Sequence, residues 1–339
     1  MRNGWKLLLL VLLAVSLTML VACEAEEEPE AVDPDEEEVD EVEPFDYVWT
    51  SGPTGGMTYP AAAGWTELIE EKVSGSRITI VEGAAIANIE KIEADEAQLG
   101  HTMGDLMAAA ERNMEPFEDG RPNVKTLANV MPFEFQFVVL EGTGLTSFEQ
   151  LKEEQYPLRL NPGEEGYSGE LATRRVLEAH GITYEDIEEW GGEIVFVPYS
   201  EGVTLMRDGH IDAFSALSSS PTPTITEIAI TRDLNLLPLS EEVQVGLFEE
   251  YGYAYGDIPA ESYEFLDEDV PGIISPMVLI ARSDVPNEQV KFMLDLIYSE
   301  EGVSRLASVH ERFTDLNIED GQEFLFQIHP GAVEFYEEN

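Results

Sequence analysis

Two glycine-rich turns are the residues of this sequence best suited to bind a ligand, and the first lies at residues 51–60. Aromatic and β-branched residues at 47–50 predict a strand before it, and apolar residues at helical spacing over 61–69 predict a helix after it. Helix N-termini carry partial positive charge, and glycine lets a ligand approach their N–H groups. The turn is either a plain strand–helix connection or a site for a carboxylate-like anion. As such a site, its binding residues would be Thr54, Gly55, Gly56, Met57 and Tyr59.

The second turn, at residues 161–169, repeats this arrangement ahead of a helix expected over 170–180. Its N-terminus offers a second set of backbone donors. An aromatic residue in the turn either stacks on a ligand or merely covers the turn. Arg174 and Arg175 lie one turn into the helix, where pairing with surface acids is favoured over binding an anion. The candidate binding residues of this turn are Tyr167, Ser168 and Gly169.

Both turns belong to an alternation of strand and helix patterns along the chain. Strands are expected at 77–82, 99–102, 124–140, 157–160, 194–197, 211–215, 234–237 and 272–281. Helices are expected near 86–92, 103–112, 200–208, 223–231, 241–250, 286–299 and 300–308, and 257–270 reads as a polar connection. Such alternation predicts parallel sheets with ligands at the carboxyl ends of the strands. The long strand at 124–140 suits a segment that leaves one lobe and enters another. We therefore expect two α/β lobes around a cleft that closes by a hinge.

Strand ends and helix starts add further candidates to this cleft. Asn88 lies in the first turns of one helix, and Thr102 ends a strand. Ser219 and Ser220 precede a helix in the second lobe. His101, beside Thr102, is expected to be packed and hydrogen-bonded rather than a ligand-binding group.

The first 46 residues indicate export and anchoring. Residues 1–23 combine two basic residues, an apolar run and a final Leu-Val-Ala-Cys, which resembles a bacterial lipobox with Cys23 as the lipidated residue. An ordinary signal peptide with an incidental cysteine is the alternative. Cys23 is the only cysteine, so no internal disulfide forms. Residues 24–46 hold 14 acidic and no basic residues and are expected to be a disordered tether.

The charge of the chain bears on whether it binds nucleic acid and on the salinity of its surroundings. The whole chain has 69 acidic and 18 basic residues, and 55 acidic residues remain beyond the tether. With no basic patch, nucleic acid is disfavoured as a partner. The chain is nevertheless 43% hydrophobic, which is typical of a folded protein. An acidic but normally hydrophobic composition indicates a salty exterior, where self-repulsion is screened.

A series of motifs resembles the TAXI family of substrate-binding proteins from tripartite ATP-independent periplasmic (TRAP) transporters. The resemblance covers residues 47–339. It rests on the two turns with their helices, on Asp208-Gly209-His210-Ile211-Asp212-Ala213-Phe214, on Ala281-Arg282-Ser283-Asp284-Val285-Pro286 and on His329-Pro330-Gly331-Ala332. Two stretches depart from the family pattern at the expected pocket, namely Gly166-Tyr167-Ser168-Gly169 and Met103-Gly104.

The resemblance implies a type II periplasmic-binding-protein fold and a small organic anion as ligand, of the glutamate, dicarboxylate or oxo-acid type. It also implies delivery to a TRAP-type membrane permease. The expected domains are a signal peptide (1–23), the tether (24–46), lobe 1 (47–140 and 256–339) and lobe 2 (141–255). We expect a lipid-anchored, extracytoplasmic monomer with no cofactor and no metal ion.

Three other classes of function are alternatives to this one. An enzyme is disfavoured, because five histidines without metal-binding spacing and one lipidated cysteine leave little catalytic chemistry. A tethered sensor with the same fold stays open, since only the partner would differ. A surface antigen without a ligand also stays open.

Overall fold

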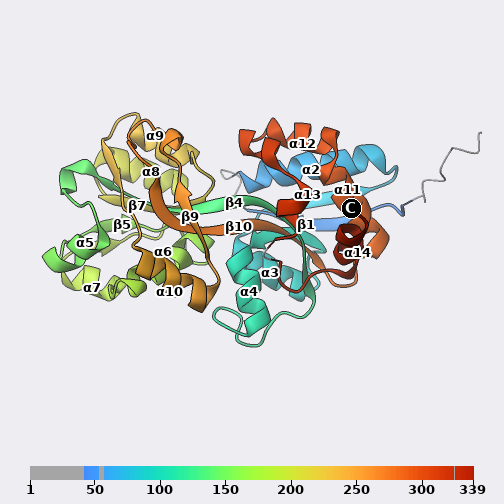
Figure 1. Ribbon diagram of the computed structural model, residues 1–339, viewed down its shortest axis with the longest axis horizontal. Coiled ribbons are helices and arrows are strands. Elements are labelled where there is room, and N and C mark those ends of the chain that lie inside the picture. The colour runs from blue at the N-terminus through green and yellow to red at the C-terminus, as the bar shows by residue number, and fades with distance from the viewer. Residues whose placement is uncertain (1–41, 53–56, 324) are drawn as a thin grey trace, which may run out of the picture. The chain divides into compact units, whose positions relative to one another are not determined.

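The computed structural model describes residues 42–52, 57–323 and 325–339. A mixed β-sheet runs through this part of the chain (Figure 1). Its strands follow the order β2-β1-β3-β10-β4-β7-β5-β6, with β8 paired to β4 and β9 to β10. The strands are β1 (Asp46–Thr50), β2 (Arg77–Val81), β3 (Leu99–Met103), β4 (Val124–Leu140), β5 (Arg159–Asn161), β6 (Glu193–Ile194), β7 (Ala213–Ser218), β8 (Leu234–Leu236), β9 (Ala254–Ile258) and β10 (Val270–Arg282).

Two long strands, β4 and β10, join the two lobes. They pair antiparallel, from Ile274 opposite Glu134 to Arg282 opposite Val124. Beyond Glu134, β4 continues into the second lobe and pairs antiparallel with β7 and β8. The expected crossing at 124–140 is therefore confirmed. The expectation of parallel sheets is wrong, because these two strands run against their neighbours. The pairs of β1 with β2 and β3, and of β5 with β6 and β7, are parallel.

Helices cover the sheet of each lobe (Figure 1). Those of the first lobe are α2 (Thr58–Lys72), α3 (Ala85–Glu93), α4 (Gly104–Arg112), α11 (Asn287–Tyr298), α12 (Glu300–Ala307), α13 (Ile318–Gly321) and α14 (Pro330–Glu338). Those of the second are α5 (Phe148–Glu154), α6 (Ser168–Ala179), α7 (Tyr184–Glu189), α8 (Tyr199–Asp208), α9 (Pro223–Ala229) and α10 (Glu241–Tyr251). Among the described residues, none forms a helix long and apolar enough to cross a bilayer.

Apolar residues at helical spacing and buried aromatic rings form the core of the first lobe. In α11, residues 290, 293, 294 and 297 are apolar and buried, so one stripe of the helix faces the core. Trp49 of β1 stacks on Trp65 of α2 with ring centroids 5.8 Å apart, and Phe313 meets Trp65 edge-on. These rings hold β1 and α2 together on either side of the first glycine turn.

A buried polar cluster ties the lobes together beside the crossover strands. Arg175 of α6 donates to Asp105 of α4 at 2.9 Å, with side chains only 3% and 1% exposed. Asp105 also accepts from Ser275 of β10 at 2.7 Å, and Arg175 donates to the Tyr253 hydroxyl at 3.0 Å. Arg175 is therefore not a surface residue, which corrects the expectation. Arg174 does lie at the surface, and it pairs with Glu115 at 2.9 Å as expected.

The N-terminal boundary of the fold lies before the predicted one. Phe45 is fully buried, and its carbonyl accepts from Arg77 N at 2.6 Å. Asp46 begins β1. The last residues assigned to the 24–46 tether therefore belong to the folded unit, because a single aromatic side chain gives them a place in the core. The signal peptide, Cys23 and the tether up to residue 41 lie outside the described residues.

Other elements also differ from expectation. The segment expected to be a polar connection from 257 begins inside β9. Ile258 belongs to the buried cluster of the second lobe that also contains Phe214. The strand expected over 194–197 is only the two-residue β6. The sequence patterns predict none of the helices α5, α7, α13 and α14.

Candidate functional site

A cavity of about 330 Å³ lies where strands from both lobes end. The first lobe contributes Gly52 after β1, Glu82 after β2 and Thr102 of β3. The second contributes Ser218 and Ser219 at the end of β7. Ser219 Oγ lies 3.9 Å from Met57 Sδ, so side chains of the two lobes touch across the cavity. The expected position of the ligand site, at the carboxyl ends of the strands and between the lobes, thus coincides with a cavity.

Six helices begin at this cavity, and none of the six has a side-chain N-cap bond within the described structure. The six are α2, α3, α4, α6, α8 and α9, and the N-cap residue of each lines the cavity. Those N-cap residues are Met57, Ala84, Met103, Tyr167, Pro198 and Thr222. The N–H groups of a first helical turn have no acceptor inside the helix. The cavity is therefore surrounded by helix ends without a side-chain cap.

Helices that begin away from the cavity are capped by their own side chains. Ser147, Thr183, Ser240, Ser299 and Asn317 accept from the first turns of α5, α7, α10, α12 and α13. His329 does the same for α14. Within the described ranges, α11 is the exception, because its N-cap is Pro286 and lines no part of the cavity. In α4, the N–H of Asp105 donates to Ser275 Oγ at 3.2 Å. For the other helices at the cavity, the contrast indicates that something other than an N-cap side chain satisfies the free N–H groups.

Three of the six helices, α2, α3 and α9, have no acidic residue in their first turn, and α2 and α3 are the longer ones, with 15 and 9 residues against 7 in α9. In contrast, α4, α6 and α8 carry Asp105, Glu170 and Glu201 there. Since an acid in the first turn offsets the helix dipole, α2 and α3 offer the more favourable places for an external negative group.

The floor of the cavity is held by hydrogen bonds within the first lobe. Asn88 donates to Ser51 O at 2.9 Å and to His101 O at 2.8 Å, and Thr50 donates to its amide oxygen at 2.7 Å. Thr102 Oγ1 donates to Ala85 O at 2.8 Å. Asn88 and Thr102 line the cavity, but their polar atoms already bind the ends of β1, β3 and α3. These two side chains thus hold the frame that presents the start of α3.

Two histidines line the cavity in neutral form. Burial lowers the pKa of His101 to about 3, and its Nδ1 lies 3.5 Å from Trp49 Nε1. This confirms that His101 is packed and hydrogen-bonded, although it also reaches the cavity. Burial, followed by the charge of Arg312, lowers the pKa of His310. Neither ring supplies positive charge at neutral pH.

Aromatic rings form the wall of the second lobe. Tyr167 meets Tyr199 edge-on at 5.6 Å and donates to Glu164 at 2.7 Å. Burial, followed by this hydrogen bond, raises the pKa of Tyr167. Gly169 is buried beneath this wall, and a Cβ there would overlap the Tyr199 hydroxyl. The glycine is needed for close packing of α6 on Tyr199 rather than for approach of a ligand.

A hydroxyl in the second lobe lacks a partner. Thr224 Oγ1 is buried, lines the cavity and makes no hydrogen bond within the described structure. It lies in the first turn of α9. An unpaired buried hydroxyl costs free energy unless a ligand or water satisfies it. Thr224 is therefore a candidate ligand donor that the sequence pattern did not indicate.

The cavity has no basic side chain among its described lining residues. Its carboxylates are Glu82 and Glu164, and the rest of its lining is largely apolar, with Met103, Phe133 and Leu217 among its residues. No group of three or more metal-binding side chains occurs in the ranges that the structure describes. Positive potential at this site therefore comes from the helix N-termini.

The structure brings together half of the predicted binding residues. The lining includes Met57, Asn88, Thr102, Tyr167, Ser168 and Ser219. It does not include Tyr59, Gly169 or Ser220. Ser220 is buried behind the cavity, where its N–H donates to Glu134 at 2.9 Å. Thr54, Gly55 and Gly56 lie outside the described residues.

Comparison with known proteins gives a family and several similar structures. A sequence model of the NMT1-like family matches residues 50–339. The alkanesulfonate-binding protein SsuA from Xanthomonas axonopodis pv. citri, bound to MOPS, is 15% identical over 87% of this chain and 84% of its own, with a TM-score of 0.46. PhnD1 from Prochlorococcus marinus (MIT 9301), in complex with methylphosphonate, is 14% identical over 86% and 96%, with a TM-score of 0.47. The periplasmic aliphatic sulphonate binding protein SsuA from Escherichia coli is 12% identical over 86% of each chain, with a TM-score of 0.44.

The two-lobed topology around β4 and β10 is that of the α/β periplasmic-binding-protein fold, which confirms the predicted fold class.

Proposed function

We propose that this chain, which belongs to the NMT1-like family, captures a small organic anion and delivers it to a TRAP-type permease. The observation that carries the anion proposal is the ring of uncapped helix N-termini around a cavity without a basic side chain among its described residues. The resemblance of the sequence motifs to the TAXI family supports the TRAP partner. Glutamate, dicarboxylates and oxo-acids are the ligand types that this resemblance favours.

The surface charge of the protein makes such local binding necessary. With a formal net charge of −51, the chain repels anions at long range. Each helix N-terminus acts like about half a positive charge and presents oriented N–H donors. The starts of α2 and α3 come from one lobe and those of α6 and α8 from the other. An anion that satisfies both sets would favour closure of the lobes.

The proposed binding residues follow from this arrangement. We propose that the backbone of Gly55, Gly56 and Met57 at the start of α2 binds the negative group, with Thr54 beside them. Ser168, Ser219 and Thr224 would add hydroxyl donors from the second lobe, and Tyr167 would cover the ligand. Gly56→Val should then weaken binding by more than about tenfold, whereas Arg174→Ala should change it little.

The ligand can be identified by native mass spectrometry of protein purified from its own host. A thermal-shift panel of monocarboxylates, dicarboxylates, oxo-acids, sulfonates and phosphonates at about 1 M salt would then rank anion classes. If no member of the panel raises the melting temperature and no small anion co-purifies, the proposed ligand class is wrong.

A substitution at the start of α3 tests the binding mechanism itself. Ala84 has the extended backbone of an N-cap residue, with φ −140° and ψ 158°. Ala84→Asp would place a carboxylate on the free N–H groups, so the identified anion should bind at least about tenfold more weakly while the fold is retained. Ala84→Asn would cap the same N–H groups without adding a charge, so comparison of the two variants separates the effect of capping from that of charge.

Pro286→Asp supplies the matched control, because Pro286 is also an uncapped N-cap residue but lies outside the cavity. It should leave anion affinity unchanged. Unchanged affinity in Ala84→Asp, or loss of binding in Arg174→Ala, would contradict the helix-terminus mechanism and favour an arginine clamp.

The permease partner needs its own test. A gene for a multi-span TRAP permease next to this one, and uptake that depends on both proteins in a reconstituted membrane, would support transport. A neighbouring sensor kinase, with no uptake, would support the alternative of a tethered sensor. We also propose that the protein acts as a monomer attached to the membrane by a lipid on Cys23.

A further inference from the structure

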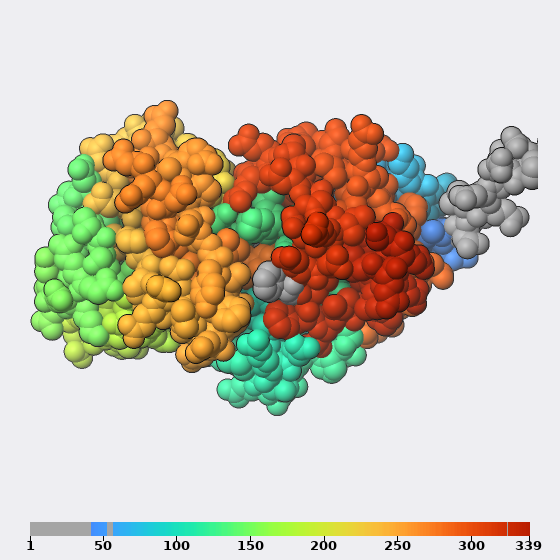
Figure 2. All heavy atoms as spheres, in the orientation of Figure 1, coloured from blue at the N-terminus to red at the C-terminus, as the bar shows by residue number. Residues whose placement is uncertain are grey.

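A second cavity, of about 480 Å³, lies beside the crossover strands and shares no lining residue with the first. Its floor includes residues 129–132 of β4 together with Ile274 and Pro276 of β10. One wall comes from α10 and β9, and the other from residues 312–323. Figure 2 shows the molecule hollowed here, with β4 at the bottom of the hollow. The cavity is thus built by both lobes and by the strands that connect them.

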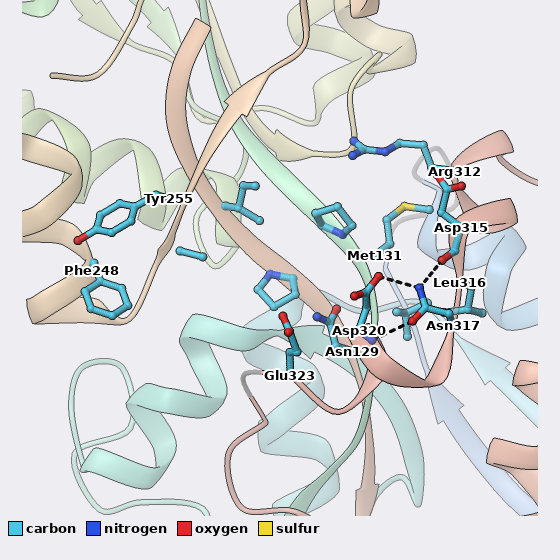
Figure 3. A pocket seen from close by; sticks show the side chains of 15 residues that line it. Asn129, Met131, Phe248, Tyr255, Arg312, Asp315, Leu316, Asn317, Asp320 and Glu323 are labelled. Atoms are coloured by element: carbon cyan, nitrogen blue, oxygen red, sulfur yellow. Dashed lines mark hydrogen bonds between the residues drawn. The ribbon is translucent and has the colours of Figure 1, made fainter. Parts of the chain in front are cut away.

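The wall from the second lobe exposes two aromatic rings. Phe248 is 42% exposed and Tyr255 is 49% exposed, and their ring centroids are 5.3 Å apart. Figure 3 shows both rings on one side of the cavity. The floor beside them is apolar and includes Val130, Met131 and Ile274. Exposed aromatic pairs above an apolar floor mark a place where another molecule can bury apolar surface.

The opposite wall carries negative charge. Asp315, Asp320 and Glu323 lie there and are exposed at the rim (Figure 3). The basic residue of the lining, Arg312, is already engaged, because its guanidinium pairs with buried Glu134 at 2.5 Å. A bound molecule would therefore meet negative charge at this wall and no charged side chain at the aromatic wall.

We infer that this cavity binds a small organic cation with an aromatic or aliphatic body at one end and an ammonium group at the other. The body would pack on Phe248, Tyr255 and the apolar floor, and the ammonium group would face Asp315 and Asp320. The volume lies within the roughly 300–1,000 Å³ of small-molecule sites, which fits such a molecule better than a folded partner. The inference does not depend on the anion site.

The test compares three probes of the same shape and different charge. They are 2-phenylethylammonium, the neutral 2-phenylethanol and the anionic 3-phenylpropionate, each titrated against the full folded protein by ligand-observed NMR. At about 1 M salt the Debye length is about 3 Å, so attraction to the acidic surface as a whole is screened. The ammonium probe should bind at least about tenfold more tightly than the alcohol, and the acid should not bind.

Variants assign the binding to this cavity. Tyr255→Ala and Asp315→Asn should each weaken the ammonium probe by at least about threefold, a change that corresponds to about 0.7 kcal/mol. Phe196→Ala and Glu337→Gln are the matched controls, because these residues are exposed and line neither cavity. Both controls should bind the probe as the parent protein does.

Three results would overturn the inference. They are no binding of the ammonium probe, equal binding of the alcohol, and binding that Tyr255→Ala and Asp315→Asn leave unchanged. If Ala84→Asp changed the affinity for the ammonium probe, the probe would be in the first cavity, which would also contradict the inference.

Discussion

Removal of one partner from the buried pair between Arg175 and Asp105 should cost the protein much of its stability. The two side chains are 3% and 1% exposed and lie 2.9 Å apart. Breaking a buried pair from one side leaves an uncompensated charge, and the expected loss is about 3–5 kcal/mol in the free energy of unfolding. Arg175→Met leaves Asp105 with Ser275 as its donor at 2.7 Å. Asp105→Leu leaves Arg175 with the Tyr253 hydroxyl and Glu115 O.

The double variant Asp105→Leu/Arg175→Met should recover most of that loss, because replacing both charges by apolar groups of similar size is often nearly neutral. Arg174→Met is the matched control. Its guanidinium pairs with Glu115 on the surface, with side-chain exposures of 31% and 63%, so its removal should cost no more than about 1 kcal/mol.

Urea denaturation at fixed high salt measures all four variants, since urea leaves ionic strength unchanged. The linear dependence of stability on urea gives the free energy in water for each variant. The prediction is wrong if both single variants lose less than about 1 kcal/mol in the free energy of unfolding, or if Arg174→Met loses as much as Arg175→Met. In either case burial would not explain the contribution of this pair to stability.

Three further predictions address the charge, the anchor and the pH response. The melting temperature should rise between about 0.01 and about 1 M salt, as the Debye length falls from about 30 to about 3 Å, and a flat or falling profile would contradict this. Cys23→Ala should release the protein from membranes; a variant that still fractionates with membrane at high salt would place the anchor elsewhere. Because the pKa of His101 is held at about 3, against about 6.5 in an unfolded chain, its contribution to stability is complete above about pH 6.5 and is lost as the pH falls toward 3. His101→Gln should flatten the decline of melting temperature over that interval, and an unchanged slope would assign the decline to other groups.

Much of the fold was readable because long elements carry their own pattern. The aromatic-rich run 124–140 forms β4 over those same residues, since 17 residues of strand pattern leave little choice. Short elements were less readable. The strand expected over 194–197 ends after Ile194, and Pro198 follows as the N-cap of α8. Arg175 could not be placed in the interior, because its burial depends on Asp105 and Tyr253, which are distant in the sequence.

The site was predicted where glycine-rich turns marked it and missed elsewhere. Such turns led to Met57 and Ser168, at the starts of α2 and α6. No such turn precedes the N-cap residues of α3 and α8, which are Ala84 and Pro198. The missing signal was the type of residue at the N-cap. Five of the six helices at the cavity begin with a poor capping residue, Thr222 of α9 being the exception, whereas serine, threonine or asparagine begins five of the helices elsewhere.

The uncapped helices have a consequence for how this protein could be stabilised. An N-cap side chain adds roughly 0.5–2 kcal/mol, so six helices that begin without one leave the unliganded protein less stable than its fold permits. Selection for heat resistance alone would favour Ser or Asp at positions such as 84 and 103. Each new N-cap side chain would accept a hydrogen bond from an N–H group that the ligand needs. Thermostable variants obtained this way should therefore bind the ligand more weakly. Improvements for laboratory use are better sought at Pro286, where a cap stabilises α11 away from the cavity.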